Sequence, residues 1–325
     1  MHDTLSLLRE LNAHEFTSGA QIAQRLAISR ASVSLGLAKA EDYGISLERR
    51  HGVGYRLAAP IEWLDAEKIS MYLPESTVAK VSVSNTLAST NRQLLLDPQH
   101  GKLLVAEWQD GGRGRLGRTW HGVLGGSLLF SFAWRFDNGS AQLAGLPLAV
   151  GVAVATVLQQ SGVAQIGLKW PNDLLLQDAT GDWAKVGGIL IEMQGDALGP
   201  SHVVIGIGLN IALPTDLNDW QAQLGQAAAS LNAGGLNCGR NELLARLIHQ
   251  LETTLAQFAE TGFAPLCARW EALHAWSNAA LNVIAANGNI QTGRFAGLAP
   301  DGSLRLDTPS GEILVHSGDV SLRRA

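Results

Sequence analysis

The sequence predicts a multidomain α/β (α+β) protein with a helical N-terminal module, a central domain on a mixed sheet, and a small antiparallel barrel at the C-terminus. Three observations support this division. The chain of 325 residues exceeds one typical domain. Strand-like and helix-like periodicities alternate through its middle. The last residues show only short alternating runs separated by Gly, Pro and Asn turns. We expect domains at 1–60, 61–277 and 278–325.

The first sixty residues predict three short helices followed by a hairpin. Ser18 and Gln21 have the spacing of a capping box before the second helix, and Ser29 can cap the third. Residues 45–50 and 55–57 resemble two strands joined by a glycine-containing turn. This order is the layout of a winged helix-turn-helix, whose third helix enters the major groove of DNA. The candidate DNA contacts are Ser29, Arg30, Ser32, Arg49, Arg50 and Arg56.

Charge limits the nucleic-acid surface to this segment. The whole chain has a formal net charge of −5, whereas residues 1–58 hold seven basic and six acidic side chains. A net charge of +1 is low for a DNA-binding module. Gly36 also costs about 1 kcal/mol inside the third helix relative to alanine. The basic wing with Arg49, Arg50 and Arg56 partly compensates, because it forms a cluster that can contact phosphates.

The central and C-terminal regions are read from their periodicity. Residues 127–136 alternate strictly, with apolar side chains on one face. Further strands are expected at 103–108, 166–169, 174–176, 186–193 and 203–209, and helices at 141–160, 241–258 and before Trp276. The charge-free run 143–158 is shorter than the ~20 residues that a bilayer requires. We expect a buried core helix there and no membrane contact.

Neither targeting nor cysteine chemistry is indicated. The N-terminus lacks a signal-peptide pattern. Cys238 and Cys267 show no metal-ligand spacing and no disulfide framework. A cytoplasmic protein is the expectation.

The segment Gly111–Arg118 has the residue types of an anion-binding loop. It satisfies G-x-G-x-x-G after a strand, but a dinucleotide fingerprint needs a helix opening at the loop. A strand follows here, which disfavours a Rossmann domain. The guanidinium groups of Arg113, Arg115 and Arg118 favour binding of phosphate or carboxylate. A flexible, solvated basic loop is the alternative.

Four other segments are ambiguous when taken singly. Asn172 and Asp173 would suit a ribose, a phosphate or Mg²⁺, or merely a turn. Lys185 precedes two glycines in a strand, so it either faces a ligand or is a solvated strand end. Residues 89–93 read as a helix start, with Thr90 and Gln93 at capping-box spacing. The glycines of 206–210 suggest a close approach to the strand.

In this order the segments resemble the biotin–protein ligase family. The resemblance rests on Ser89-Thr90-Asn91, Gln109 with Gly112–Arg118, Lys169–Asp173, Lys185–Leu190 and Gly206–Asn210, and it extends over nearly the whole chain. Bifunctional bacterial members, which also repress the biotin operon, carry a winged helix and an SH3-like barrel. The resemblance therefore implies a class II synthetase-like catalytic domain between these two modules.

The family's chemistry implies biotin as substrate, ATP as co-substrate and Mg²⁺ as metal, without a tightly held prosthetic group. Biotin would be activated as biotinyl-5′-adenylate and transferred to a lysine of the biotin carboxyl carrier protein of acetyl-CoA carboxylase. Operator DNA and a homodimer formed on adenylate binding are the other implied partners. Residues 186–193 are the candidate dimer strand.

The resemblance also implies roles for individual residues. The catalytic candidates are Lys185, which would bridge the biotin carboxyl oxygen and the α-phosphate, and the loop residues Arg113 and Arg115. The biotin-binding candidates are Ser89, Thr90, Asn91, Gln109, Arg113, Gly114, Arg115, Lys185, Gly187, Gly188 and Gly206. The ATP or adenylate candidates are Arg115, Arg118, Trp120, Lys169, Asn172, Asp173, Asn210 and Trp220. Asp173 is the candidate ligand of Mg²⁺.

Three other functions stay open. A lipoate–protein ligase shares the architecture, although lipoate lacks the ureido group that Gln109 and residues 89–91 would bind. A sensor that binds a small acid without catalysis would not need the arginine loop and Lys185. A ligase whose DNA-binding domain is non-functional is the third.

Overall fold

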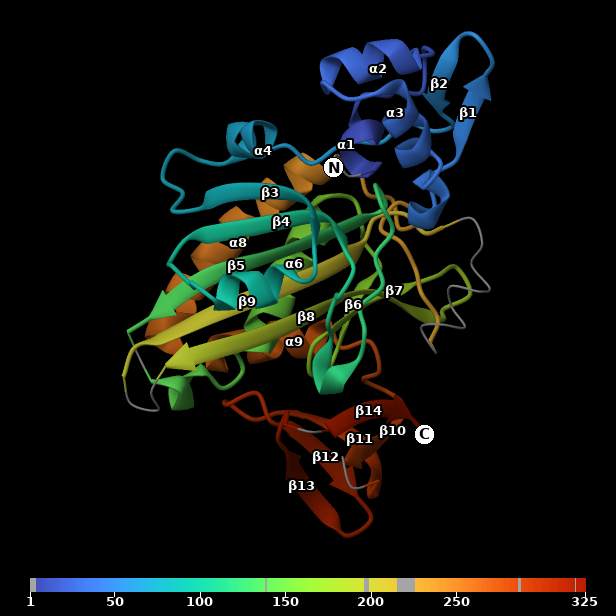
Figure 1. Ribbon diagram of the computed structural model, residues 1–325. Helices are drawn as coiled ribbons and strands as arrows, with labels where there is room; N and C mark the ends of the chain where they lie inside the picture. Colours follow the sequence, from blue (N-terminus) through green and yellow to red (C-terminus); the bar gives the residue numbers. More distant parts are fainter. Residues whose placement is uncertain (1–3, 138, 196–198, 215–225, 286–287, 319) are drawn as a thin grey trace.

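The computed structural model describes residues 4–325 except 138, 196–198, 215–225, 286–287 and 319 (Figure 1). Its N-terminal domain contains α1 (Thr4–Arg9), α2 (Gly19–Arg25), α3 (Arg30–Leu37) and the hairpin β1 (Leu47–Arg50)–β2 (Gly54–Leu57). The capping box is confirmed, since Gln21 N donates to Ser18 Oγ and Ser18 N donates to Gln21 Oε1. Ser29 caps α3 through the amide of Ser32. The predicted helix-turn-helix with a wing is the observed arrangement.

Gly36 has a packing role that offsets its low helix propensity. A Cβ atom at this position would lie 2.1 Å from Leu7 Cδ1, and Thr4 Oγ1 donates to the Gly36 carbonyl at 3.2 Å. Any larger side chain would push α1 away from α3. The glycine that weakens the helix in isolation therefore allows the first and third helices to cross closely.

The central domain is a seven-stranded mixed sheet in the order β3-β4-β5-β9-β8-β7-β6. Its strands are β3 (Lys80–Leu87), β4 (Lys102–Gln109), β5 (Ser127–Phe136), β6 (Ile166–Lys169), β7 (Asp173–Gln177), β8 (Trp183–Gly195) and β9 (Ser201–Asn210). Among the described strands of this sheet, β3 and β4 pair in parallel and the other neighbours pair antiparallel. Strand β3 is an element that the sequence reading missed.

Helices cover the two faces of this sheet unequally (Figure 1). The helices are α4 (Ala66–Tyr72), α5 (Thr90–Leu95), α6 (Leu146–Gln160), α8 (Arg240–Thr261) and α9 (Cys267–Ala272). Leu128, Phe130 and Phe132 of β5 are buried in one core with α6 and α8, as the period-two pattern predicts. Helix α5 contacts β4, β5, β8 and β9. Among the described residues, no helix is long and apolar enough to cross a membrane.

The C-terminal domain is β-rich, as predicted. Strands β10 (Ala280–Ala285), β11 (Ile290–Leu298), β12 (Leu304–Thr308), β13 (Gly311–Val315) and β14 (Val320–Arg324) form an antiparallel sheet in the order β13-β12-β11-β10-β14. In the described part of the chain no ladder joins β13 to β14. The sheet therefore has two ends here, and the closure expected of a barrel is not observed.

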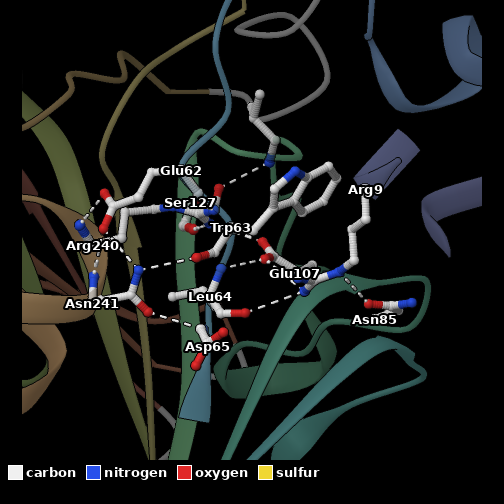
Figure 2. Close-up of polar contacts among 11 residues, drawn as sticks. Arg9, Glu62, Trp63, Leu64, Asp65, Asn85, Glu107, Ser127, Arg240 and Asn241 are labelled. Carbon is white, nitrogen blue, oxygen red and sulfur yellow. Dashed lines mark hydrogen bonds and ion pairs between the residues drawn. The ribbon is translucent and has the colours of Figure 1, made fainter. Parts of the chain in front are cut away.

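A buried carboxylate joins the N-terminal and central domains (Figure 2). Glu107 of β4 is fully buried and forms ion pairs with Arg240 of α8 at 3.0 Å and with Arg9 of α1 at 3.2 Å. Arg9 also donates to Asn85 Oδ1 at 2.9 Å and lies over the Trp63 ring. The sequence analysis did not predict this network, although a glutamate inside an apolar strand, Glu107, indicates that a buried charge needs a partner.

Apolar contacts reinforce the same junction. The Trp108 ring lies 5.2 Å from that of Tyr43 in an edge-on arrangement. Leu124, which belongs to the central domain, is buried in the core of the N-terminal domain. The segment between Trp108 and Leu124 contains residues 111–118, which we call the glycine–arginine loop. Both ends of this segment therefore rest on the N-terminal domain.

Candidate active site

A cavity of about 350 Å³ opens above the middle of the central sheet. Leu129 and Leu190, which lie opposite Gly208 and Gly206 of β9, give it an apolar floor. The predicted site residues that line it are Ser89, Thr90, Asn91, Gln109, Arg113, Gly114, Arg115, Arg118, Trp120, Lys169, Asn172, Asp173, Lys185, Gly188, Gly206 and Asn210. Side chains from five separate segments thus meet around one volume. Trp220 lies outside the described residues.

The start of α5 supplies one polar wall of the cavity. Ser89, rather than Thr90, is the N-cap residue and its Oγ accepts from Arg92 N, so the capping box expected between Thr90 and Gln93 does not form. Thr90 instead donates its backbone N–H to Gln109 Oε1 at 2.6 Å. Its hydroxyl lies 2.7 Å from Ser131 Oγ, which also lies 2.5 Å from Asn91 Oδ1. The sequence analysis did not identify Ser131 as a site residue. Its only indication in the sequence is a polar residue among the apolar side chains of strand β5.

Protein side chains occupy the space beside the strand glycines. A Cβ at Gly206 would lie 2.1 Å from Asn91 Oδ1, and one at Gly208 would lie 2.6 Å from the Trp120 ring. Asn91 is held there by donating to the Leu190 carbonyl at 3.0 Å. The close approach predicted at these glycines is real. Its occupants are an asparagine and a tryptophan that themselves line the cavity.

Gly187 does not face the cavity, which corrects its place among the biotin-binding candidates. The β7–β8 register moves from Leu174↔Gly187 to Leu175↔Lys185, leaving a bulge at Val186. Lys185 and Gly188 therefore face the cavity together. Gly187 points the other way, where a Cβ would lie 2.6 Å from Leu209 Cδ2.

Two lysines share the carboxylate of Asp173 at the polar end of the cavity. Lys185 Nζ lies 2.6 Å from Oδ1 and Lys169 Nζ lies 3.1 Å from Oδ2. Burial alone would raise the pKa of Asp173, but the two ammonium groups lower it to about 2. Burial lowers the pKa of Lys169, which Asp173 partly offsets. The site therefore holds more positive than negative charge and suits an anion.

The described residues do not fit a magnesium site of their own. Both oxygens of Asp173 are already paired with lysines. No three His, Cys, Asp or Glu side chains gather into a metal-binding group within the part of the chain that the structure describes. Mg²⁺ usually relies on substrate phosphates as well as carboxylates. The geometry thus gives the expected metal role of Asp173 no support.

The glycine–arginine loop spans the cavity from β8 to the C-terminal domain. Arg113 forms an ion pair with Glu192 at 2.7 Å. Arg115 donates to Asn172 Oδ1 at 3.3 Å and to the Gly318 carbonyl at 2.6 Å. Arg118 lies 3.5 Å from Ser321 Oγ. The loop is followed by β5 instead of a helix, which confirms that it is not a dinucleotide fingerprint.

Residues of the C-terminal domain also line the cavity, which sequence reading did not foresee. Val320, Ser321 and Leu322 contribute to its wall. Nothing in their own pattern of short alternating strands marks them as site residues. Only the packing of β14 against the loop brings them there.

The predicted DNA-contacting arginines divide into two groups. Arg49 donates to the Leu37 carbonyl at the end of α3, and Arg56 forms an ion pair with Glu48 at 2.6 Å. Both are therefore engaged within the domain. Arg30 and Arg50 are exposed, as is Arg49, and Arg50 lies over the Phe16 ring.

The candidate dimer strand is only in part an edge. Strand β8 lies between β9 and β7 as far as Gly188, so this part cannot pair with another chain. Ile189 still exchanges hydrogen bonds with Asn172, whereas residues 190–195 extend beyond the end of β7 and form ladder pairs only with β9 in the described sheet. A strand could be added there.

Comparison with known proteins follows the same three-part order. The model of the biotin/lipoate A/B protein ligase family matches residues 79–210, that of the biotin protein ligase C-terminal domain residues 280–323, and an HTH domain residues 4–56. The bifunctional ligase/repressor BirA of Salmonella typhimurium is 35% identical over 332 residues, covering 100% of both chains. This chain belongs to the biotin protein ligase family.

Other members of the family agree with this placement. BirA of Escherichia coli is 35% identical over 99% of this chain and 97% of its own. The solved biotin protein ligase of Aquifex aeolicus in complex with biotin and ATP is 28% identical, with a TM-score of 0.64 over 75% of this chain and 98% of that one. The resemblance of the short motifs thus extends to full-length sequence and to three-dimensional fold.

Proposed function

We propose that this chain is an ATP-dependent biotin–protein ligase that forms biotinyl-5′-AMP and transfers biotin to a lysine of the biotin carboxyl carrier protein. We infer that it also binds operator DNA as a repressor of biotin biosynthesis genes. The observation that carries the ligase is the meeting of Lys185, Arg115 and the polar wall of Thr90 and Gln109 around one cavity. Its family relatives are named as ligases and as ligase/repressors.

Biotin would enter with its ring system against the apolar floor and its ureido group toward Ser89, Thr90 and Gln109. These residues offer hydroxyl and amide groups at the buried end of the cavity. The carboxylate would then lie near Lys185. Apolar walls with few polar groups are the usual composition of a small-molecule site.

In the first step a biotin carboxylate oxygen attacks the α-phosphorus of ATP, and the bond to the pyrophosphate oxygen breaks. Lys185 is held in place by its ion pair with Asp173, so it can stabilise the negative charge shared between the carboxyl oxygen and the α-phosphate. Arg113, Arg115 and Arg118 would neutralise the phosphates from the loop. Lys169, Asn172, Asn210 and Trp120 are placed to line the nucleotide side.

In the second step the amine of the carrier lysine attacks the acyl carbon of the mixed anhydride. The new amide bond forms, the amine loses its proton and AMP leaves. The apolar floor would keep water from the anhydride until the carrier arrives. Mg²⁺ would enter with the phosphates of ATP, since the described residues offer it no separate site.

The remaining features of the proposal concern assembly. We place the domain boundaries after residues 60 and 277, with a C-terminal domain of the SH3-like class and a catalytic domain of the class II synthetase-like type. A homodimer formed on adenylate binding would use the open edge of β8 at residues 190–195.

Mass spectrometry of a carrier fragment after incubation with the chain, biotin and MgATP tests the ligase. A mass increase equal to one biotinyl group on a lysine is expected, together with release of AMP and pyrophosphate. Pyrophosphate release with lipoate instead of biotin would assign the site to the lipoate branch. A gel shift on the chain's own biotin-gene promoter, with and without biotin and ATP, tests the repressor.

A further inference from the structure

The outward face of α3 has an unusual composition for a helix that would enter DNA. Val33 and Leu37 are buried in the domain core. The residues opposite them on the helix are Ala31, Ser32, Leu35 and Ala38, and all four are exposed. Leu35 has 71% of its surface exposed. The centre of this face therefore carries no charge and no amide.

Such a face excludes the commonest way of reading bases. Arginine and lysine read guanine, and asparagine and glutamine read adenine, through paired hydrogen bonds. None of these side chains occupies the centre of the α3 face. An apolar side chain meets one distinct feature in the major groove, the C5-methyl group of thymine.

The rim of the same face favours DNA over a protein partner. Arg30 is exposed at the first turn of α3, and Lys39 is exposed just beyond its end. Arg50 is exposed on the neighbouring wing, which Figure 1 shows beside α3. Glu41 and Asp42 follow Lys39 and reduce its effect, so Arg30 and Arg50 are the main candidates for phosphate contacts. A narrow apolar strip between cations fits the floor and walls of a groove.

We propose that Leu35, supported by Ala31 and Ala38, is the specificity-determining residue of α3 and reads thymine methyl groups in the major groove. The proposal rests on the proposed DNA-binding function and names what that function recognises. The expected site is a duplex in which thymine is required at the positions under Leu35 and a substituted pyrimidine without the methyl group is not equivalent.

Replacing thymine by uracil removes only this methyl group and leaves all hydrogen-bonding groups unchanged. We would first select a binding site from randomised duplexes with the full chain, biotin and MgATP. Each thymine of the site is then replaced by uracil, and the dissociation constant is measured by fluorescence anisotropy. Burial of one methyl group predicts about fourfold weaker binding at each contacted position.

Leu35→Ala connects the effect to this residue. The variant should bind the thymine duplex more weakly and lose most of the difference between thymine and uracil, with biotin ligation unchanged. Met71→Ala, which truncates another exposed apolar side chain with 82% of its surface exposed on α4, should keep the wild-type difference. It controls for loss of apolar surface in general.

Four results would overturn the proposal. Equal affinity of the wild type for thymine and uracil duplexes would refute it while leaving DNA binding intact. A uracil effect that persists unchanged in Leu35→Ala would remove Leu35 from the role. Failure to select any duplex, or binding of a protein through Leu35 instead, would refute the repressor part of the proposed function as well, and intact ligation would show that the enzyme is sound.

Discussion

Lys185 Nζ lies 2.6 Å from Asp173 Oδ1 across the polar end of the cavity, and this contact fixes where the central cation of the site can act. Asp173 stays ionised well below neutral pH because Lys185 and Lys169 lower its pKa to about 2 against the opposing effect of burial. A carboxylate or phosphate entering the cavity therefore meets an ammonium group that is already charged and oriented.

Lys185→Ala should reduce carrier biotinylation by a factor on the order of 100 or more, because it removes the cation nearest the expected reacting oxygens. The measurement is the rate of AMP release with a carrier fragment, with circular dichroism to establish that the fold is retained. Lys102→Ala removes a half-exposed lysine paired with Asp97 and should leave the rate unchanged. Wild-type turnover in purified Lys185→Ala would refute the assigned role.

The Asp173→Asn variant distinguishes two possible roles of Asp173, as the counter-ion of two lysines and as a ligand of Mg²⁺. As the counter-ion of two lysines, Asp173 should be needed for activity at every magnesium concentration, and the concentration giving half-maximal rate should stay as in the wild type. A metal ligand predicts instead that excess Mg²⁺ restores the rate. A magnesium titration of both proteins at saturating ATP and biotin decides between the two.

Arg115→Glu should strongly reduce adenylate formation. The change removes the donor to Asn172 and to the Gly318 carbonyl and places a negative charge where phosphates would bind. Pyrophosphate release from ATP and biotin, measured without carrier, isolates this step. Arg135→Glu inverts an exposed arginine on β5 and should have little effect; equal losses in both variants would argue for a general effect of charge.

Arg9→Ala should loosen the N-terminal domain while leaving Glu107 paired with Arg240. Loss of a charged hydrogen-bonded contact to a buried carboxylate predicts about 2 kcal/mol less stability in urea unfolding. Because Trp108 and Leu124 rest on the same domain, amide hydrogen exchange between them should also increase. Arg25→Ala, at an exposed pair with Glu10, should change stability by less than about 1 kcal/mol. Equal exchange in Arg9→Ala and wild type would show that the junction does not support the loop.

The candidate site was largely predictable because its short segments, each ambiguous when taken singly, resemble in their order those of the biotin–protein ligase family. The strand periodicity of residues 127–136 and the glycines of 111–118 located one wall and the loop without tertiary information. The features of the site that the sequence did not predict depend on strand register or on contacts between distant segments. The bulge at Val186 turned Gly187 away, and no local rule predicts a bulge in β8. Ser131 contacts Thr90 and Asn91, which line the cavity, only because strand pairing places it beside α5, and residues 320–322 reach the cavity only through domain packing.

Acid should destabilise the junction between the central and C-terminal domains through His274. Burial lowers the pKa of His274 to about 4, although its Nδ1–H donates to the Leu168 carbonyl at 3.1 Å. The ring lies 4.3 Å from that of Phe295 in the C-terminal domain, and Nε2 is buried with no hydrogen-bond partner among the described residues. Protonation would therefore place a charge in an apolar contact.

The direction in which stability changes with pH follows from the lowered pKa of His274. The unfolded chain binds a proton near pH 6.5 and the folded chain only near pH 4, so this contribution to stability is complete above pH 6.5 and is lost as the pH falls through that interval. Its full size is about 3 kcal/mol. His274→Gln should be less stable at pH 7 but show a shallower loss between pH 6.5 and 4 than the wild type in urea unfolding. Because carboxylates titrate in the same interval in both proteins, the difference between the two curves isolates the histidine. His249→Gln, at an exposed position of α8, should follow the wild-type curve; parallel curves for His274→Gln and the wild type would exclude His274 as the source.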